Sequence, residues 1–271
     1  MKIGDSMGLN ENRILKCLRD KRPSIILRTF ETLESTNSFI KQRVTEDGFY
    51  DYMVVSSEQT EGQGRFNRRW FSPKGGLYVS FGFSVIRLQE NPSLVGLVLA
   101  NSVVSVLNQL SVPARIKWPN DIVLNHKKIG GILSELIADG ELYSVIGVGL
   151  NLNFQREILP EELHQTATTV MTELESQYDI EDITCKIALD FFGTLDNIGT
   201  TISIASILDT WRNLDCTLGE DVIIETRDQR FNGRAVDITE HGFLIVKMPS
   251  GELREIQAGD VIHSRHMGSN Q

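Results

Sequence analysis

Arginine and glycine are concentrated in one short stretch, Gly-Gln-Gly-Arg-Phe-Asn-Arg-Arg at residues 62–69. Glycine lets the backbone approach an anion and present N–H groups to it. Arginine adds forked donors that keep their charge and suit phosphate oxygens. The stretch is not a Walker loop, because no Gly-Lys-Ser/Thr sequence ends it. Two interpretations are open: an anion-binding loop, or a solvated basic turn between two strands.

A second polar group is Lys-Trp-Pro-Asn-Asp at residues 117–121. Pro119 fixes a turn between two predicted strands and holds Trp118 in an extended conformation. The turn should aim Asn120 and Asp121 outward. An amide and a carboxylate placed there can hold magnesium or a ribose.

Two further motifs combine glycine with a polar side chain. Lys128 begins a predicted strand in which Gly130 and Gly131 leave room for a ligand against the backbone. Gly-Val-Gly-Leu-Asn at residues 147–151 ends in Asn151 and carries small residues on one face. For the Lys128 motif the alternative is a hairpin with a solvated lysine. For the motif at residues 147–151 it is a core strand packed closely against a helix.

The elements that must position these groups follow from hydrophobic periodicity. Residues 77–85 alternate between apolar and small or polar side chains, which predicts a strand with one buried face. Ser93 to Leu110 predicts a buried helix, and Ser35 or Thr36 can cap a helix that runs to about Val44. Further strands are expected at residues 25–30, 54–55, 115–118, 122–124, 128–137 and 142–150, and further helices at 14–18 and 180–211. Short turns between neighbours favour antiparallel pairing.

The pattern changes near Leu214. From Gly219 onward, short strands are predicted at residues 222–226, 231–238, 243–247 and 253–257, separated by glycine-containing turns. Such strands fit a small barrel. The sequence therefore predicts a variable segment at 1–25, a larger domain at 26–213, a small domain at 214–265 and a disordered end at 266–271.

Length and charge limit the classes of function. The chain has 271 residues and a net charge of -9, which argues against a general nucleic-acid binder, since phosphate contacts need a basic surface. No segment has the length and apolarity of a membrane span. The three cysteines are widely spaced and indicate neither a disulfide framework nor a zinc site. A reducing cytoplasm is the natural location.

Taken in order, these motifs resemble those of biotin–protein ligases. The resemblance uses Glu-Ser-Thr-Asn at 34–37, Gln59, the glycine–arginine loop with Trp70, Lys-Trp-Pro-Asn-Asp, Lys-x-Gly-Gly-Ile-Leu and Gly-Val-Gly-Leu-Asn. It runs from about residue 30 to residue 153 and resumes at Trp211-Arg212 and at 216–219. Each motif alone is moderately specific, and the ordered set is highly specific.

The resemblance implies an α+β catalytic domain related to class II aminoacyl-tRNA synthetases, with a mixed sheet backed by helices and an SH3-like C-terminal domain. It implies an ATP-dependent ligase of the biotin–[acetyl-CoA-carboxylase] type. Biotin and ATP form biotinyl-5′-AMP, and biotin is then transferred to a lysine of a biotin carboxyl carrier domain. Mg²⁺ would accompany ATP, no metal would be tightly bound, and a homodimer is expected.

The resemblance also assigns residues to the two halves of the intermediate. Lys128 and Arg65 are the expected catalytic residues. The expected biotin site comprises Ser35, Thr36, Asn37, Gln59, Gly64, Arg65, Lys128, Gly130 and Gly131. The expected nucleotide site comprises Gln63, Gly64, Arg65, Arg68, Trp70, Asn120, Asp121 and Asn151. Asp121 is the candidate for magnesium that arrives with ATP.

This sequence departs from the family pattern at several positions. Gln63 stands where an arginine is common, and Asn67 where a glycine is common, so the phosphate role of Gln63 is left open. Arg265 matches a family arginine with the register shifted by one. About 30 residues precede Glu31, too few for the winged helix of repressor-type members, which points to a monofunctional ligase. The alternatives are a lipoate–protein ligase and a biotin-responsive repressor.

Overall fold

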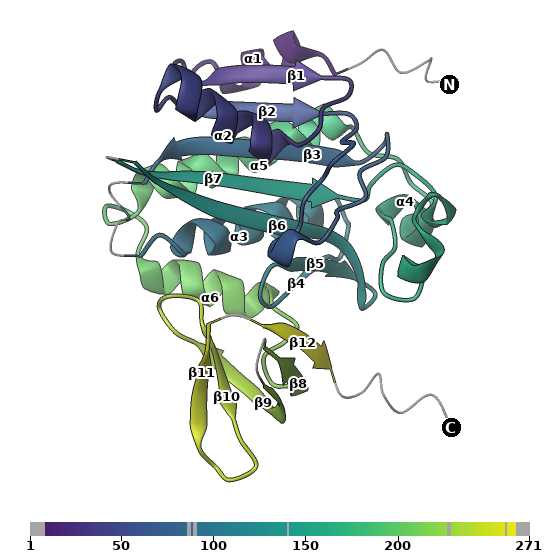
Figure 1. Cartoon of the computed structure of the whole chain (residues 1–271), viewed down its shortest axis with the longest axis vertical. Helices are drawn as coiled ribbons and strands as arrows, with labels where there is room; N and C mark the ends of the chain where they lie inside the picture. The colour runs from purple at the N-terminus through teal and green to yellow at the C-terminus, as the bar shows by residue number, and fades with distance from the viewer. Residues whose placement is uncertain are drawn as a thin grey trace.

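A seven-stranded mixed sheet forms the larger part of the molecule (Figure 1). The computed structural model describes residues 9–85, 88, 91–139, 141–226, 229–257 and 259–263. The strand order is β1-β2-β3-β7-β6-β5-β4, with β1 and β2 parallel and the other neighbours antiparallel. The strands are β1 (Ile26–Phe30), β2 (Tyr52–Ser56), β3 (Leu77–Ser84), β4 (Arg115–Lys117), β5 (Asp121–Leu124), β6 (Lys127–Asp139) and β7 (Glu141–Leu150).

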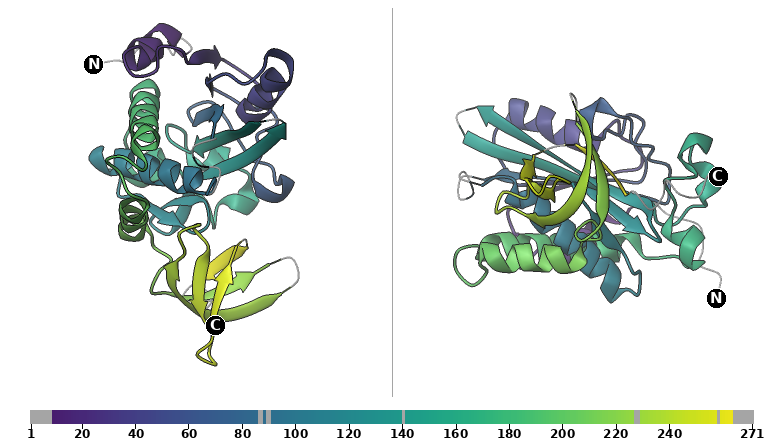
Figure 2. Two further views of the ribbon diagram at one scale, coloured as in Figure 1. Left: turned by 90° about the vertical axis from the view of Figure 1, so that its left-hand side faces the viewer. Right: turned by 90° about the horizontal axis from the view of Figure 1, so that it is seen from below.

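Helices cover both faces of this sheet. The helices are α1 (Glu11–Leu18), α2 (Thr36–Asp47), α3 (Leu94–Gln109), α4 (Val170–Leu174), α5 (Ile180–Asn197) and α6 (Ile204–Leu214). Helices α3 and α5 lie together on one face and α2 lies on the other, as the view from below shows (Figure 2). Helix α1 packs against α5 and β1, so its Ile14 and Leu18 join the main core.

Strand β3 has two buried faces, and the expectation of one buried face is wrong. Val79 and Phe81 enter the main core, as their alternation predicted. Tyr78 and Ser80 on the opposite face are buried as well. The reason is α2, which packs across β2, β3 and β7 on that side. Alternation identified the strand, but it could not show that a second layer covers its polar face.

Helix α2 begins at the edge of the site described below. Ser35 Oγ accepts a hydrogen bond from the Ser38 N–H at 3.4 Å, which caps the first turn. The helix is capped at its C-terminal end by Gly48, whose φ is 98°. Glycine adopts this positive φ with little strain because it has no Cβ. The cap fixes Thr36 and Asn37 in the first turn, next to the middle of β6, where Asn37 contacts Leu133 and Glu135.

The C-terminal region forms a separate five-stranded antiparallel sheet in the order β11-β10-β9-β8-β12. Its strands are β8 (Asp221–Glu225), β9 (Arg230–Ile238), β10 (Leu244–Lys247), β11 (Leu253–Ile256) and β12 (Asp260–His263). The first four were predicted. Sequence reasoning missed β12, whose apolar signal is only two residues long. The expected disordered end at 266–271 lies outside the described residues.

Hydrogen bonds join the two sheets beside the Lys-Trp-Pro-Asn-Asp turn. The buried Trp118 donates from Nε1 to the Gly242 carbonyl at 3.0 Å, and its backbone N–H donates to Thr217 Oγ1 at 2.9 Å. The Trp118–Pro119 peptide bond is cis. Within the described ranges, no helix is both long and apolar enough to cross a membrane.

Candidate active site

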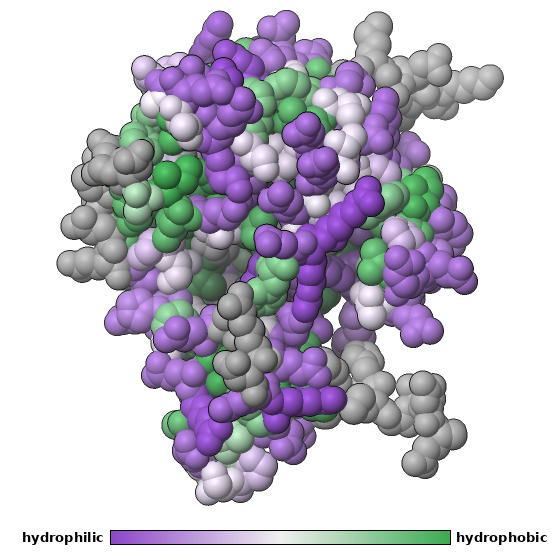
Figure 3. Space-filling model, viewed as in Figure 1, coloured by the Kyte–Doolittle hydropathy of each residue, from purple (hydrophilic) through white to green (hydrophobic). Residues whose placement is uncertain are grey.

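A cavity of about 500 Å³ lies against the first half of β6 and the second half of β7. The loop 62–69, the turn 117–121 and strand β12 form its other sides. Hydrophilic side chains cross this face of the molecule above the junction of the two sheets (Figure 3). Every site residue predicted from the sequence lines the cavity except Gly130. The residues so placed are Ser35, Thr36, Asn37, Gln59, Gln63, Gly64, Arg65, Arg68, Trp70, Asn120, Asp121, Lys128, Gly131 and Asn151.

The glycine–arginine loop folds back on itself at the cavity rim. The Gly64 N–H donates to the Arg68 carbonyl at 2.7 Å, and the Trp70 N–H donates to the Gly62 carbonyl at 2.8 Å. A Cβ on Gly62 would lie 2.5 Å from the Trp70 carbonyl oxygen, so the narrow base of the loop requires glycine. Phe66 and Asn67 at the tip both have positive φ of 57°. The loop therefore has a defined turn at its tip.

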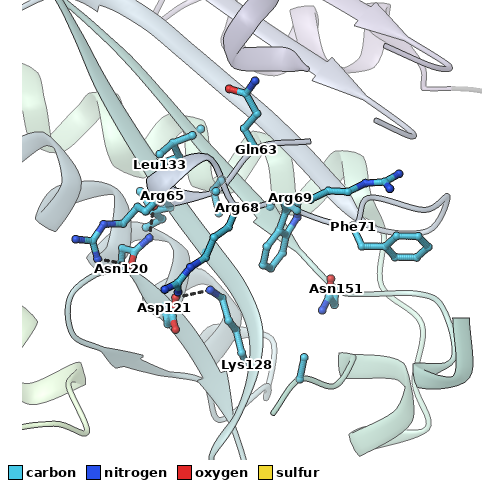
Figure 4. A pocket seen from close by; sticks show the side chains of 18 of the residues that line it. Gln63, Arg65, Arg68, Arg69, Phe71, Asn120, Asp121, Lys128, Leu133 and Asn151 are labelled. Carbon is cyan, nitrogen blue, oxygen red and sulfur yellow. Dashed lines mark hydrogen bonds and ion pairs between the residues drawn. The ribbon is translucent and has the colours of Figure 1, made fainter. Parts of the chain in front are cut away.

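The arginines of this loop lie beside two aspartates. Arg65 Nη1 donates to Asn120 Oδ1 at 3.4 Å, and Arg68 Nη2 lies 2.6 Å from Asp260 Oδ2. Burial lowers the pKa of the Arg65 guanidinium, and the carboxylates of Asp260 and Asp121 oppose that shift. Figure 4 shows the side chains of Arg65 and Arg68 extending toward Asn120 and Asp121, whereas Gln63 points away from them.

Lys128 forms the second cationic element of the cavity. Its Nζ lies 2.6 Å from Asp121 Oδ1 and 5.2 Å from the centre of the Trp70 ring. The backbone of Lys128 is held on both sides, because its N–H donates to the Thr166 carbonyl at 2.8 Å and its carbonyl accepts from the Thr168 N–H at 2.9 Å. The lysine is therefore anchored at its backbone and aimed into the cavity, which favours the ligand-site interpretation over a solvated hairpin.

Asn120 links the turn to strand β6 and faces the cavity rather than solvent. The side-chain Nδ2 of Asn120 donates to the Ile132 carbonyl at 2.6 Å, and the backbone carbonyl of Asn120 accepts from the Ile132 N–H at 2.9 Å. These bonds leave Oδ1 directed at Arg65. Asn120 and Asp121 point outward from the turn as expected, but they point into an enclosed cavity because the loop and β12 lie above them.

Side chains that line the cavity explain why small residues recur along β7. A Cβ on Gly149 would lie 2.4 Å from Trp70 Nε1, and a Cβ on Gly147 would lie 2.3 Å from Asn37 Oδ1. The two glycines therefore make space for cavity side chains, and the motif lines the pocket while Gly147 also packs closely against the first turn of α2. Trp70 Nε1 itself is buried with no hydrogen-bond partner among the described residues.

Gly130 faces away from the cavity because β6 carries a bulge. Its Cβ would lie 2.4 Å from Leu150 Cδ2, on the core side, whereas a Cβ on Gly131 would lie 3.4 Å from Lys128 Cε. The pairing of β5 with β6 shifts between Ile122 opposite Gly130 and Val123 opposite Lys128. A bulge inserts one residue into the alternation. Lys128 therefore shares a face with Gly131 and not with Gly130.

A hydrogen-bonded wall closes the end of the cavity next to α2. Gln59 Oε1 accepts from the Thr36 backbone N–H at 2.8 Å, and Gln59 Nε2 donates to Ser72 Oγ at 3.0 Å. Asn37 is buried, and its amide is fully engaged by the protein. Asn37 Nδ2 donates to Glu135 Oε2 at 2.9 Å, and Ser80 Oγ donates to Asn37 Oδ1 at 2.6 Å.

Asn151 lies at the opposite end, at the base of the cavity. Its side chain is 2 % exposed, and Nδ2 donates to the Thr168 carbonyl at 3.0 Å. Oδ1 is buried and has no hydrogen-bond partner among the described residues. Unsatisfied buried acceptors are rare, so a ligand donor is the natural partner.

Several lining residues were not predicted. Asp260 and Val261 come from β12, about 190 residues after the loop that they face, and Ser80 comes from the polar face of β3. No local pattern marks them. Other unpredicted lining residues include Arg69, Phe71, Lys117, His126, Ile132, Leu133, Leu159, Leu163, Thr166 and Ala167. Arg265 lies outside the described residues.

The cavity has no cluster of metal ligands. Among the described residues, no three histidine, cysteine, aspartate or glutamate side chains are grouped to hold a metal ion. Asp121 is paired with Lys128, and Asp260 with Arg68. Both carboxylates that line the cavity therefore already have a cationic partner.

Comparison with known proteins places this geometry in a family. Residues 29–153 match the biotin/lipoate A/B protein ligase family, and residues 217–264 match the biotin protein ligase C terminal domain. The chain is 30% identical over 210 residues to the biotin–[acetyl-CoA-carboxylase] ligase of Paracoccus denitrificans, covering 73% of this chain and 85% of the relative. It is 28% identical over 235 residues to the bifunctional ligase/repressor BirA of Bacillus subtilis, covering 85% and 72%.

A solved structure agrees with the sequence comparisons. The biotin protein ligase of Aquifex aeolicus, in complex with biotin and ATP, aligns with a TM-score of 0.76 and 28% identity. The alignment covers 88% of this chain and 99% of that one. The α+β fold and the SH3-like second sheet expected from the sequence are thereby confirmed. The chain belongs to the biotin/lipoate A/B protein ligase family and is a biotin–protein ligase.

Proposed function

We propose that the protein activates biotin with ATP and transfers it to a lysine of a biotin carboxyl carrier domain. The observation that carries the proposal is the cavity itself. Its lining combines a neutral hydrogen-bonded wall next to α2, the buried amide of Asn151 and five cationic side chains, which are Arg65, Arg68, Arg69, Lys117 and Lys128. That arrangement fits a ligand with a polar uncharged head, a central anionic junction and a base.

In the first step a biotin carboxylate oxygen attacks the α-phosphorus of ATP. A carboxyl–phosphate bond forms, the bond between the α-phosphorus and its bridging oxygen breaks, and pyrophosphate leaves. Both reactants are anionic, so Arg65 and Lys128 would neutralise their repulsion and the charge that develops. Their half-buried positions strengthen this effect relative to water. Fixing both reactants in line supplies much of the remaining acceleration.

The two ends of the intermediate would occupy opposite ends of the cavity. The ureido ring would contact the wall that contains Ser35, Thr36 and Gln59, and Gly131 would lie alongside it. The nucleotide would contact Arg68, Trp70, Asn120 and Asn151. Mg²⁺ would enter with ATP and stabilise the leaving pyrophosphate, with Asp121 as its nearest protein carboxylate.

In the second step the acceptor lysine attacks the carbonyl carbon of the mixed anhydride. An amide bond forms, the carbonyl carbon–oxygen bond to phosphate breaks, AMP leaves and the amine loses its proton. Residues 26–213 would carry both steps, and residues 214–265 would form the second domain. The end of α6 at Leu214 supports that division.

Intact mass measurement of an acceptor domain tests the proposal. The protein is incubated with ATP, Mg²⁺, biotin and a biotin carboxyl carrier domain, and one biotin per acceptor is expected. Matched reactions omit ATP, replace the acceptor lysine by arginine, or replace biotin by lipoate. Lipoate transfer without biotin transfer would show a lipoate ligase instead. No modification with either acid would contradict the proposed function.

A further inference from the structure

The turn between β5 and β6 carries a histidine at a position that favours glycine. Leu124 pairs with Lys127, so Asn125 and His126 alone form the turn. Their φ angles are 50° and 64°, and a type I′ turn has positive φ at both central residues. This turn favours asparagine followed by glycine, because glycine has no Cβ to strain a positive φ. His126 therefore makes the turn less stable than glycine would.

His126 is exposed and lines the cavity, so a ligand there can reach its ring. The order of residues along β6 indicates which part of a ligand it would meet. The wall next to α2 meets β6 at Leu133, whose carbonyl accepts from Asn37 Nδ2 at 3.4 Å. Lys128, at the proposed reacting centre, precedes Leu133 in this strand, and His126 precedes Lys128. His126 therefore lies beyond the reacting centre, on the side away from the wall.

The other groups at this end of the cavity suit a flat base that carries an amino group. The Asn151 N–H donates to the Ile129 carbonyl at 2.6 Å, which places Asn151 beside the same stretch of β6. Its buried Oδ1 has no partner among the described residues and can accept from an amino group. Leu159 and Ala167 add apolar lining, and a backbone bridge pairs Ala167 with Lys128. An acceptor beside apolar surface matches adenine and not a phosphate.

We propose that His126 is a specificity-determining residue whose imidazole ring stacks on the purine base of ATP. The inference deepens the proposed function and rests on it, because ATP is the nucleotide of that reaction. Aromatic side chains bind bases through the π face of the base. Backbone strain at a ligand site persists where the strained residue serves the ligand. Histidine in place of glycine thus lowers the stability of the turn and raises the affinity for the nucleotide.

Biotin-dependent ATP–pyrophosphate exchange by the full chain tests this inference. His126→Gly should raise the KM for ATP about fivefold to tenfold, the lower range for loss of a stacked ring. The KM values for pyrophosphate and biotin should not change, because neither carries a nucleobase. The urea midpoint should be no lower than that of the parent, since glycine relieves the positive φ. His126→Asn tolerates this φ but has no ring, so it should raise the KM for ATP similarly. His126→Phe keeps an aromatic ring and should retain the parent KM for ATP.

Ser111→Gly is the matched control, because Ser111 also has a positive φ, of 63°, and does not line the cavity. It should leave every kinetic constant at the parent value. A parent-level KM for ATP in folded His126→Gly overturns the inference, and so does an equal rise in Ser111→Gly. A rise in the KM for pyrophosphate would show a phosphate contact, and a rise only in the KM for the acceptor domain would show a docking role; either result overturns stacking on the base. A parent without biotin-dependent exchange refutes the proposed function, and the inference with it.

Discussion

At the scale of single residues, the positive charge of Lys128 has the clearest chemical role. Lys128→Ala should lower adenylation about a hundredfold to a thousandfold, because a lost electrostatic contact to a developing charge typically costs about 3–4 kcal/mol. ATP–pyrophosphate exchange measures this step directly. Lys127→Ala is the control, since Lys127 is the neighbouring lysine of β6 and does not line the cavity. Near-parent exchange by folded Lys128→Ala would contradict the assigned role.

Asp215 gives a prediction for the pH dependence of stability. Asp215 is 4 % exposed, and burial raises the pKa of its carboxyl group from 3.8 to about 6. Hydrogen bonds from the N–H groups of Leu218 and Thr217 lower this pKa, but by less than burial raises it. The folded-state pKa is above the unfolded one, so this group stabilises the fold less as pH rises through 6. Between pH 5 and 7.5 the loss should be about 1 kcal/mol.

Urea unfolding of Asp215→Asn measures that loss. Asparagine cannot ionise, so the stability of the variant relative to the parent should improve by about 1 kcal/mol between pH 5 and pH 7.5. Asp20→Asn, a change on the exposed surface, controls for altered net charge. A difference from the parent that is the same at both pH values would show that Asp215 does not titrate in this range.

At the scale of elements, the loop 62–69 forms part of the cavity rim. We predict that it is mobile without ligand and ordered over biotinyl-AMP, because Arg65, Arg68 and Arg69 repel one another until an anion joins them. Asp260 and Asp121 offset only part of this charge, and Asp121 is also paired with Lys128. Trypsin cleavage at Arg68 and Arg69 should therefore slow when biotin and ATP are added together. Equal cleavage with and without substrates would argue against ordering.

The same loop should retain the reactive intermediate. Arg65→Gly removes the half-buried guanidinium that contacts Asn120, so biotinyl-AMP should escape and label lysines of a bystander protein. Biotin incorporated into a non-acceptor protein measures the escape. Lys74→Ala, outside the loop, is the control. Parent-level bystander labelling, with adenylate still formed, would show that the loop does not retain the intermediate.

At the scale of the whole molecule, we predict a homodimer that pairs sheet edges. Strand β1 is an edge of the larger sheet, and among the described residues its only strand partner is β2, so no strand covers its outer edge. The Thr29 N–H points away from β2, toward Glu11 Oε2 at 3.3 Å. Thr29→Pro should therefore block edge pairing, whereas Thr29→Ala should not.

Light scattering at micromolar concentration, with biotin and ATP present, tests the dimer. The parent and Thr29→Ala should give the dimer mass and Thr29→Pro the monomer mass. A monomeric parent would contradict the prediction. A dimeric Thr29→Pro variant would show that a different surface forms the interface.

The sequence by itself determined the elements and the chemical classes of the site. Alternation along residues 77–85, the buried helix and the ordered polar motifs are local patterns, and local patterns follow from backbone geometry and propensity. The same motifs carried the family resemblance, which implied the mixed sheet and the second, SH3-like domain.

Tertiary structure alone decided which face each motif presents and which distant residues join it. The bulge in β6 turned Gly130 away from the cavity and kept Gly131 in it, because one inserted residue reverses all later alternation. Packing of α2 turned the polar face of β3 into a cavity wall and brought Ser80 and Glu135 to Asn37. Docking of the second sheet placed Asp260 opposite Arg68. These contacts join residues far apart in the chain, so no window of the sequence contains both partners.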